Sequence, residues 1–102
     1  MKTAFKMHLK PGFAAEYRKR HDAIWPELQQ LLKDNGIHDY TIFLDEATHT
    51  LFAVQQQSGA GSQDLGANPI VQRWWAYMAD IMDTHADNSP ISTPLTEMFH
   101  ME

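Results

Sequence analysis

The chain of 102 residues contains no cysteine, which excludes disulfide bonds and any chemistry that depends on a thiolate. It also lacks an apolar run close to the roughly 18 residues that a membrane-spanning helix needs. Charged residues interrupt the apolar ones at positions 1–7, unlike the continuous hydrophobic segment of a secretory signal. We therefore expect a cytoplasmic protein that has no membrane partner.

Positive charge is scarce as well. Eight lysine and arginine residues stand against 13 aspartate and glutamate residues, which gives a net charge of −5. The only basic cluster is short, at residues 18–20, so nucleic acid is not an expected partner. The length and the apolar content of 43% fit one globular domain over residues 1–102.

The usual motifs for metals, nucleotides and acyl transfer are absent. None of the six histidines falls in a His-x-His or His-Glu-x-x-His spacing, and there is neither a glycine-rich phosphate loop nor a Gly-x-Ser-x-Gly elbow. The sequence therefore predicts no metal and no cofactor. What remains is acid and base chemistry performed by side chains.

Apolar periodicity divides the first third of the chain into a strand and a broken helix. Residues 3–9 alternate in the period of two that is typical of a half-buried strand. Residues 13–32 show helical spacing, and Gly36 follows as a left-handed stop. Pro26 lacks an amide donor and disfavours helical geometry before it, which predicts a break at that point.

Further along, residues 39–44 and 51–57 read as two strands of an antiparallel hairpin. Residues 58–68 are rich in glycine and polar side chains, which is typical of a flexible connection with room for one helical turn. Spacing then predicts a helix over 69–82 and a final strand over 95–101.

The element order predicts an α+β protein with a ferredoxin-like βαββαβ antiparallel sheet and two helices on one face. Apolar side chains such as Phe43, Phe52 and Val54 are expected on the other face as well. A second copy would cover that face most economically, so we expect a homodimer in the form of a dimeric α/β barrel.

Trp74 and Trp75 are neighbours on the helix predicted over 69–82. Successive helical residues point about 100° apart, so one indole can pack inward while the other covers a surface or lines a pocket. Flat aromatic faces beside polar groups suit a sugar or another ring. The alternative is that both indoles only seal a core or a subunit interface.

Tyr17 and His21 lie four residues apart on the first predicted helix and therefore share one face. An imidazole has the pKa that suits proton transfer near neutrality. The alternative is a histidine on the surface or one that caps the helix before its break. Tyr40 begins a predicted strand and could bond a ligand or anchor the strand end.

Together these residues resemble the L-rhamnose mutarotases, a family of small enzymes of carbohydrate metabolism. The segments that carry the resemblance are 16–21 (Glu-Tyr-Arg-Lys-Arg-His), 24–28 (Ile-Trp-Pro-Glu-Leu), 38–40 and 42–45, 72–75 (Gln-Arg-Trp-Trp) with Tyr77, Met78, Asp80 and Met82, and 87–90 (Asp-Asn-Ser-Pro). The resemblance covers nearly the whole chain and departs from the family pattern mainly at 55–68, a difference that concerns substrate selectivity.

The resemblance implies a dimeric ferredoxin-like α/β barrel that interconverts the α and β pyranose anomers of L-rhamnose. It implies that His21 is the proton donor and that Tyr17, Tyr40, Trp74 and Trp75 bind the sugar. The hypothesis for the mechanism is that protonated His21 donates to the ring oxygen, while a hydroxyl, a carboxylate or water accepts the anomeric proton.

Other functions remain open at this point. One is a non-catalytic module of the same dimeric fold that binds a small molecule, and another is a mutarotase for a different deoxysugar such as L-fucose. A cofactor-free monooxygenase is a further alternative, by analogy of fold alone.

Overall fold

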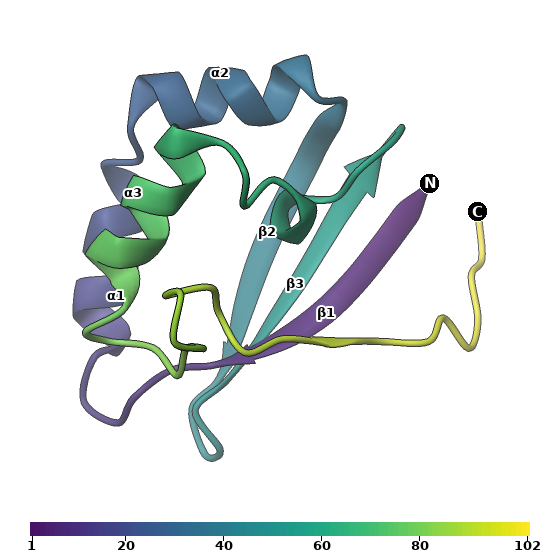
Figure 1. Ribbon diagram of the computed structural model, residues 1–102. Helices are drawn as coiled ribbons and strands as arrows, with labels where there is room; N and C mark the ends of the chain where they lie inside the picture. The colour runs from purple at the N-terminus through teal and green to yellow at the C-terminus, as the bar shows by residue number, and fades with distance from the viewer.

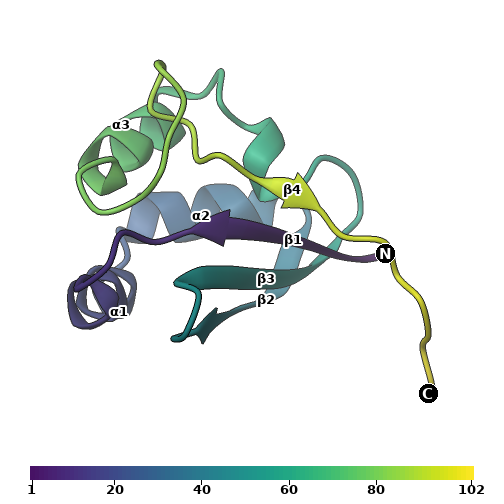
Figure 2. The ribbon, with the colours of Figure 1, turned by 90° about the horizontal axis from the view of Figure 1, so that it is seen from below.

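The computed structural model describes residues 1–102. Its elements, in chain order, are β1 (Lys2–His8), α1 (Ala14–Asp22), α2 (Pro26–Asp34), β2 (Ile37–Asp45), β3 (Thr50–Gln57), the short 3-10 helix η1 (Ser62–Asp64), α3 (Pro69–Met78) and β4 (Thr93–Pro94). The strands form one antiparallel sheet in the order β2-β3-β1-β4. The three α-helices gather on one side of the sheet, and both chain ends lie away from them (Figures 1 and 2). None of these helices has the length and apolar character needed to cross a bilayer.

The predicted break in the first helical region is confirmed. Trp25 has extended backbone angles, φ −62° and ψ 129°, and Pro26 is the first residue of α2. A proline fits the first helical turn because its missing amide would have no partner there. Gly36 has a φ of 78°, the left-handed conformation expected at the end of α2. One predicted helix is therefore two helices, α1 and α2.

The third helix is shorter than predicted. α3 ends at Met78, whereas the sequence pattern predicted helix as far as residue 82. Ile81 and Met82 are still buried, at 0% and 4% exposure, but they pack from a turn. The backbone of Met82 bridges to Leu9, and the Ile81 carbonyl accepts from the Lys10 amide at 2.9 Å. Apolar spacing persisted past the helix end because these contacts also need buried side chains.

The predicted final strand over 95–101 is wrong. β4 is only Thr93–Pro94, and its pairing with β1 ends after Phe5↔Pro94 and Lys6↔Thr93. The chain then leaves the sheet edge (Figure 1), and Met98 and Phe99 are 88% and 81% exposed. Their side chains find no layer of this chain to pack against, so alternation alone did not produce a strand.

The core lies between the helices and the inner face of the sheet. The half-buried strand predicted over residues 3–9 is confirmed, since Phe5 and Met7 of β1, together with Leu9 beyond its end, are buried on one face. Opposite them pack Leu28, Val71, Trp74 and Met78 from the helices. The outer face of the sheet carries Phe43 paired with Phe52, and Phe43 is 60% exposed.

A β-bulge in β2 decides which side chains of that strand point inward. His38 pairs with Gln56 but Thr41 pairs with Val54, so β2 contains one more residue than β3 between these pairs. Asp39 sits in the bulge with a φ of 49°. Because side chains alternate with period two, the extra residue reverses the faces of everything after it. Tyr40 therefore turns toward the helices.

Candidate active site

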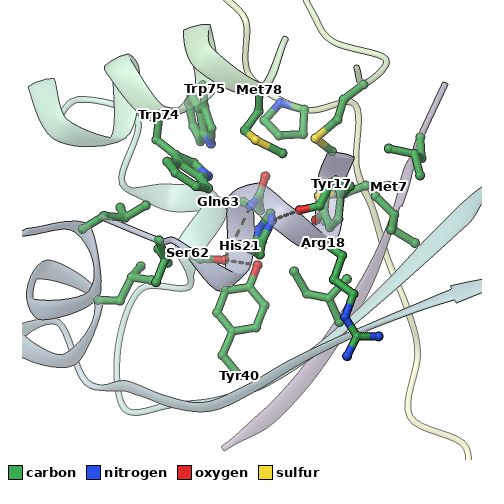
Figure 3. Close-up of a pocket in the computed structure, with 18 of the residues that line it drawn as sticks. Met7, Tyr17, Arg18, His21, Tyr40, Ser62, Gln63, Trp74, Trp75 and Met78 are labelled. Carbon is green, nitrogen blue, oxygen red and sulfur yellow. Dashed lines mark hydrogen bonds between the residues drawn. The ribbon is translucent and has the colours of Figure 1, made fainter. Parts of the chain in front are cut away.

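A cavity of about 970 Å³ opens between the helices and the inner face of the sheet. All the residues predicted for the site line it, namely Tyr17 and His21 from α1, Tyr40 from β2, and Trp74 and Trp75 from α3. Figure 3 shows His21 between the two tyrosines, with the indoles along α3. The volume is at the upper end of the usual range for small-molecule pockets. Elements far apart in the sequence thus supply one pocket.

His21 is fixed in one orientation by the helix that carries it. Its Nδ1 lies 3.1 Å from the backbone carbonyl oxygen of Tyr17, and its ring stacks on the Tyr17 ring with centroids 4.3 Å apart at 24°. A carbonyl oxygen only accepts hydrogen bonds, so Nδ1 carries the hydrogen and donates it. Nε2 is therefore the nitrogen free to exchange a proton.

The cavity alters the acidity of its titratable groups. Burial lowers the pKa of His21 from its ordinary value of 6.5, against a smaller opposing effect of its hydrogen bond to the Tyr17 carbonyl. Burial raises the pKa of Tyr17, and the nearby phenol of Tyr40 adds to that rise. Burial also raises the pKa of Tyr40, although its hydrogen bond with Ser62 opposes this. Near neutral pH both phenols therefore keep their hydrogens, and the neutral form of His21 is favoured.

Trp74 belongs to an aromatic cluster beside His21. Its ring meets the His21 ring edge to face, with centroids 5.4 Å apart at 87°, and meets Trp25 in the same way at 5.0 Å. Trp25 in turn stacks on Tyr77 at 5.7 Å. Trp74 is 8% exposed, so it is the inward indole of the pair.

Trp75 packs against the segment between β3 and α3. A methyl carbon placed on Gly66 would lie 2.7 Å from Cζ3 of this indole, so the ring rests directly on the glycine backbone. Gln72 holds the segment in place by donating from Nε2 to the Gly66 carbonyl at 2.9 Å. Only a residue without a side chain permits this approach.

Arg20 ties the helix of His21 to the end of α3. Its guanidinium donates to the Tyr77 carbonyl at 2.7 Å and to the Asp80 carboxylate at 2.8 and 3.2 Å, and it lies 4.6 Å above the Tyr77 ring. The Arg20 side chain is only 11% exposed. This contact joins α1, which carries His21, to the end of α3, which carries Trp74.

Sequence reasoning missed the polar residues contributed by the segment after β3. Ser62 and Gln63 line the cavity, and Ser62 reaches the phenol oxygen of Tyr40 at 3.4 Å. Buried Gln55 stands behind Ser62. Polar residues within a glycine-rich segment read as a flexible connection, and no local pattern distinguished these. No group of three His, Asp or Glu side chains is placed to hold a metal ion.

Fold and site define a small α+β protein whose cavity has aromatic walls, two neutral phenols and the buried imidazole of His21, suited to a polar ring-shaped molecule. A family model described as L-rhamnose mutarotase matches residues 2–101. The chain belongs to the L-rhamnose mutarotase family.

Individual relatives agree with this assignment. The chain is 60% identical to the L-rhamnose mutarotase of Phocaeicola vulgatus, over 99% of this chain and 98% of the relative. It is 61% identical to that of Bacteroides thetaiotaomicron, with the same coverage. A crystal structure of the L-rhamnose mutarotase from Formosa agariphila superposes with a TM-score of 0.94 at 56% identity, covering 100% of this chain and 99% of the other. The similarity therefore extends over the whole fold.

Proposed function

We propose that this protein is an L-rhamnose mutarotase, an isomerase of the aldose 1-epimerase type that interconverts the α and β pyranose anomers of L-rhamnose. The observation that carries the proposal is the convergence of His21, Tyr17, Tyr40, Trp74 and Trp75 on one cavity. It occurs in a chain that is about 60% identical to relatives bearing that name.

Interconverting the anomers requires opening of a cyclic hemiacetal. A proton leaves the anomeric hydroxyl, another reaches the ring oxygen, and the aldehyde rotates and closes again. Protonated His21 donates from Nε2 to the ring oxygen of the sugar, while its Nδ1–H keeps donating to the Tyr17 carbonyl oxygen. On closure the neutral imidazole of His21 takes that proton back from the sugar hydroxyl that attacks the aldehyde. A hydroxyl, a carboxylate or water accepts the anomeric proton on opening and returns it to the new anomeric oxygen on closure.

The walls of the cavity bind the sugar. The indoles of Trp74 and Trp75 offer apolar faces to the C–H side of a pyranose, and the phenols of Tyr17 and Tyr40 bond its hydroxyls. Both phenols keep their hydrogens near neutral pH because burial raises their pKa values. Each can therefore donate a hydrogen bond to a sugar oxygen.

The lowered pKa of His21 gives the proposed acid role a defined pH dependence. A less stable imidazolium is a stronger acid, but it forms only at lower pH. The enzyme-dependent kcat/KM should therefore rise as pH falls toward that lowered pKa. The spontaneous rate is subtracted at each pH. A kcat/KM that falls over the same range would make His21 the base rather than the acid.

The direct test is magnetisation exchange by NMR between the two anomeric protons of L-rhamnose at equilibrium. We expect the protein to accelerate exchange, and His21→Ala to reduce the acceleration by about 10²-fold to 10⁴-fold. His85→Ala is the matched control, because His85 is exposed and does not line the cavity. A His21→Ala protein that binds L-rhamnose and keeps its full rate would exclude the role of His21.

The same assay separates the alternatives. L-Rhamnose binding without accelerated exchange would favour a non-catalytic binding module. Faster exchange with L-fucose than with L-rhamnose would indicate a mutarotase for another deoxysugar. Oxygen consumption with an electron-rich aromatic substrate would indicate a monooxygenase.

The proposal extends to assembly and location. The strand order β2-β3-β1-β4 supports a ferredoxin-like domain over residues 1–102. The exposed Phe43, with Met98 and Phe99 of the C-terminal segment, supports a homodimer that covers the outer face of the sheet. We expect Phe43→Lys to produce monomers in analytical ultracentrifugation. A dimer unaffected by Phe43→Lys would locate the interface elsewhere. The proposed location is the cytoplasm, with no nucleic acid or membrane partner.

A further inference from the structure

A buried chain of hydrogen bonds runs from β3 to the cavity. Gln55, which is 1% exposed, donates from Nε2 to Ser62 Oγ at 2.9 Å, and its Oε1 accepts from the Ser62 backbone amide at 3.0 Å. Ser62 Oγ lies 3.4 Å from Tyr40 Oη. The amide orientation of Gln55 follows from chemistry, because a backbone N–H can only donate and so must face Oε1.

Counting the hydrogens in the Gln55–Ser62–Tyr40 hydrogen-bond chain gives the direction of each bond. A hydroxyl has one hydrogen and two acceptor positions. Ser62 Oγ accepts from Gln55 Nε2 and, at 3.5 Å, from Gln63 Nε2. Its single hydrogen is then directed to Tyr40 Oη. Tyr40 thus accepts a hydrogen bond from Ser62, which leaves its own hydrogen for the cavity that it lines.

We propose that Gln55 is a positioning residue that acts through Ser62 to orient the Tyr40 hydroxyl as a donor toward a sugar oxygen. Without the Gln55 amide, Ser62 Oγ has an open acceptor position, so the Tyr40 hydroxyl donates to Ser62 and presents only a lone pair to the cavity. The proposal rests on the proposed function, because it assigns a direction to one hydrogen bond between the protein and the sugar. It also gives a role to residues 55–68, the segment in which the protein departs from the family pattern.

Contacts within the segment that contains Ser62 also hold this residue in place. Ser62 is the first residue of η1, and the preceding Gly61 amide donates to the Asp64 carboxylate at 2.9 Å. Ser62 is 7% exposed, so water does not compete freely for its hydroxyl. The bulge at Asp39 brings Tyr40 to the same face as Gln55. These three constraints place serine and phenol together before any ligand binds.

The test is a double-mutant cycle that measures kcat and KM for anomer exchange. We expect Tyr40→Phe and Ser62→Ala each to lower kcat/KM by about three- to ten-fold, the usual value of one hydrogen bond. In the Tyr40→Phe background, Ser62→Ala should change kcat/KM less than about twofold. Equal losses in both backgrounds would show that Ser62 has only a structural role and would overturn the proposal.

Gln55→Glu tests the first member of the chain. A carboxylate at this position accepts from the serine hydroxyl and draws its hydrogen away from Tyr40. We expect Gln55→Glu to lower kcat/KM by as much as Ser62→Ala does. In the Tyr40→Phe background, Gln55→Glu should cause no further loss. Gln56→Glu is the matched control, because it makes the same change on the outer face of β3. If Gln55→Glu does not fold, the uncharged Gln55→Met replaces it, with the same expectation. A variant that lowers kcat/KM equally in both backgrounds would remove Gln55 from the proposal.

Failure of the proposed function is distinguishable from failure of this inference. If the wild-type protein binds L-rhamnose without accelerating exchange, the same cycle is measured on Kd by isothermal titration calorimetry, with the same expected pattern. Non-additive effects on Kd would support the hydrogen-bond chain even though the enzyme function is wrong. A wild-type protein that neither accelerates exchange nor binds L-rhamnose would overturn both.

Discussion

Gly66 supports the Trp75 indole, and a single added methyl group should disturb it. A methyl carbon at Gly66 would lie 2.7 Å from Cζ3 and 2.9 Å from Cη2 of Trp75. Carbon atoms at rest are about 3.5–4.0 Å apart, so ring and loop must separate by roughly 1 Å. The backbone itself permits alanine, because Gly66 is not among the glycines with positive φ. Any effect of Gly66→Ala is therefore steric.

We expect Gly66→Ala to lower the free energy of unfolding by about 1–3 kcal/mol, the usual cost of overpacking. At this chain length each 1 kcal/mol lowers Tm by about 4–8 °C. Because Trp75 lines the cavity, KM for L-rhamnose should rise as well. Thermal melts followed by circular dichroism and the NMR exchange assay measure the two effects.

Gly59→Ala is the matched control, since Gly59 lies in the same connecting segment and a methyl carbon there would meet nothing within 4 Å. Its Tm should stay unchanged or rise slightly. If Gly66→Ala melts at the same temperature as Gly59→Ala, the steric argument is wrong. In a Trp75→Leu background the cost of Gly66→Ala should vanish, and a cost that persists would place the strain elsewhere.

Three further predictions follow from the site. Because the folded pKa of His21 lies below 6.5, the unfolded chain binds more protons than the folded protein. The free energy of unfolding should therefore decrease as pH falls from about 6.5 through that lowered pKa, and His21→Asn should flatten this slope in urea titrations. Asp39→Val should cost about 1–2 kcal/mol at its positive φ, whereas Asp39→Gly should be tolerated in the same titrations. Arg20→Met should lower Tm and kcat/KM together, and Asp80→Asn, which keeps an acceptor oxygen, should lower both less.

Much of the fold could be predicted from the sequence because local chemistry decides it. Pro26 and Gly36 act on the backbone through their own covalent structure, so the helix break and the helix end could be placed without tertiary information. Alternation in residues 3–9 likewise identified the buried face of β1. The end of α3 at Met78 could not be placed, because buried positions continue through Ile81 and Met82 in another conformation.

The candidate site divides in the same way. Tyr17 and His21 could be paired from sequence because four residues on a helix fix which side chains are neighbours. The contact between Ser62 and Tyr40 joins residues that are 22 positions apart and depends on how a glycine-rich segment folds back on the sheet. No periodicity encodes such a contact. The family resemblance supplied Tyr40, but it supplied neither Ser62 nor Gln55.

The two places where alternation failed have different physical meanings. In β2 the pattern is broken by one inserted residue, with Asp39 at a φ of 49°, and the result is that Tyr40 faces the cavity. The positive φ of Asp39 accompanies the bulge that turns Tyr40, a proposed sugar-binding residue, toward the cavity. In residues 95–101 the apolar pattern is present but unused, with Phe99 81% exposed. Exposed apolar side chains of this kind are expected where a second copy of the protein packs against them. The bulge in β2 is therefore linked to the proposed sugar-binding cavity, and residues 95–101 are linked to the proposed homodimer.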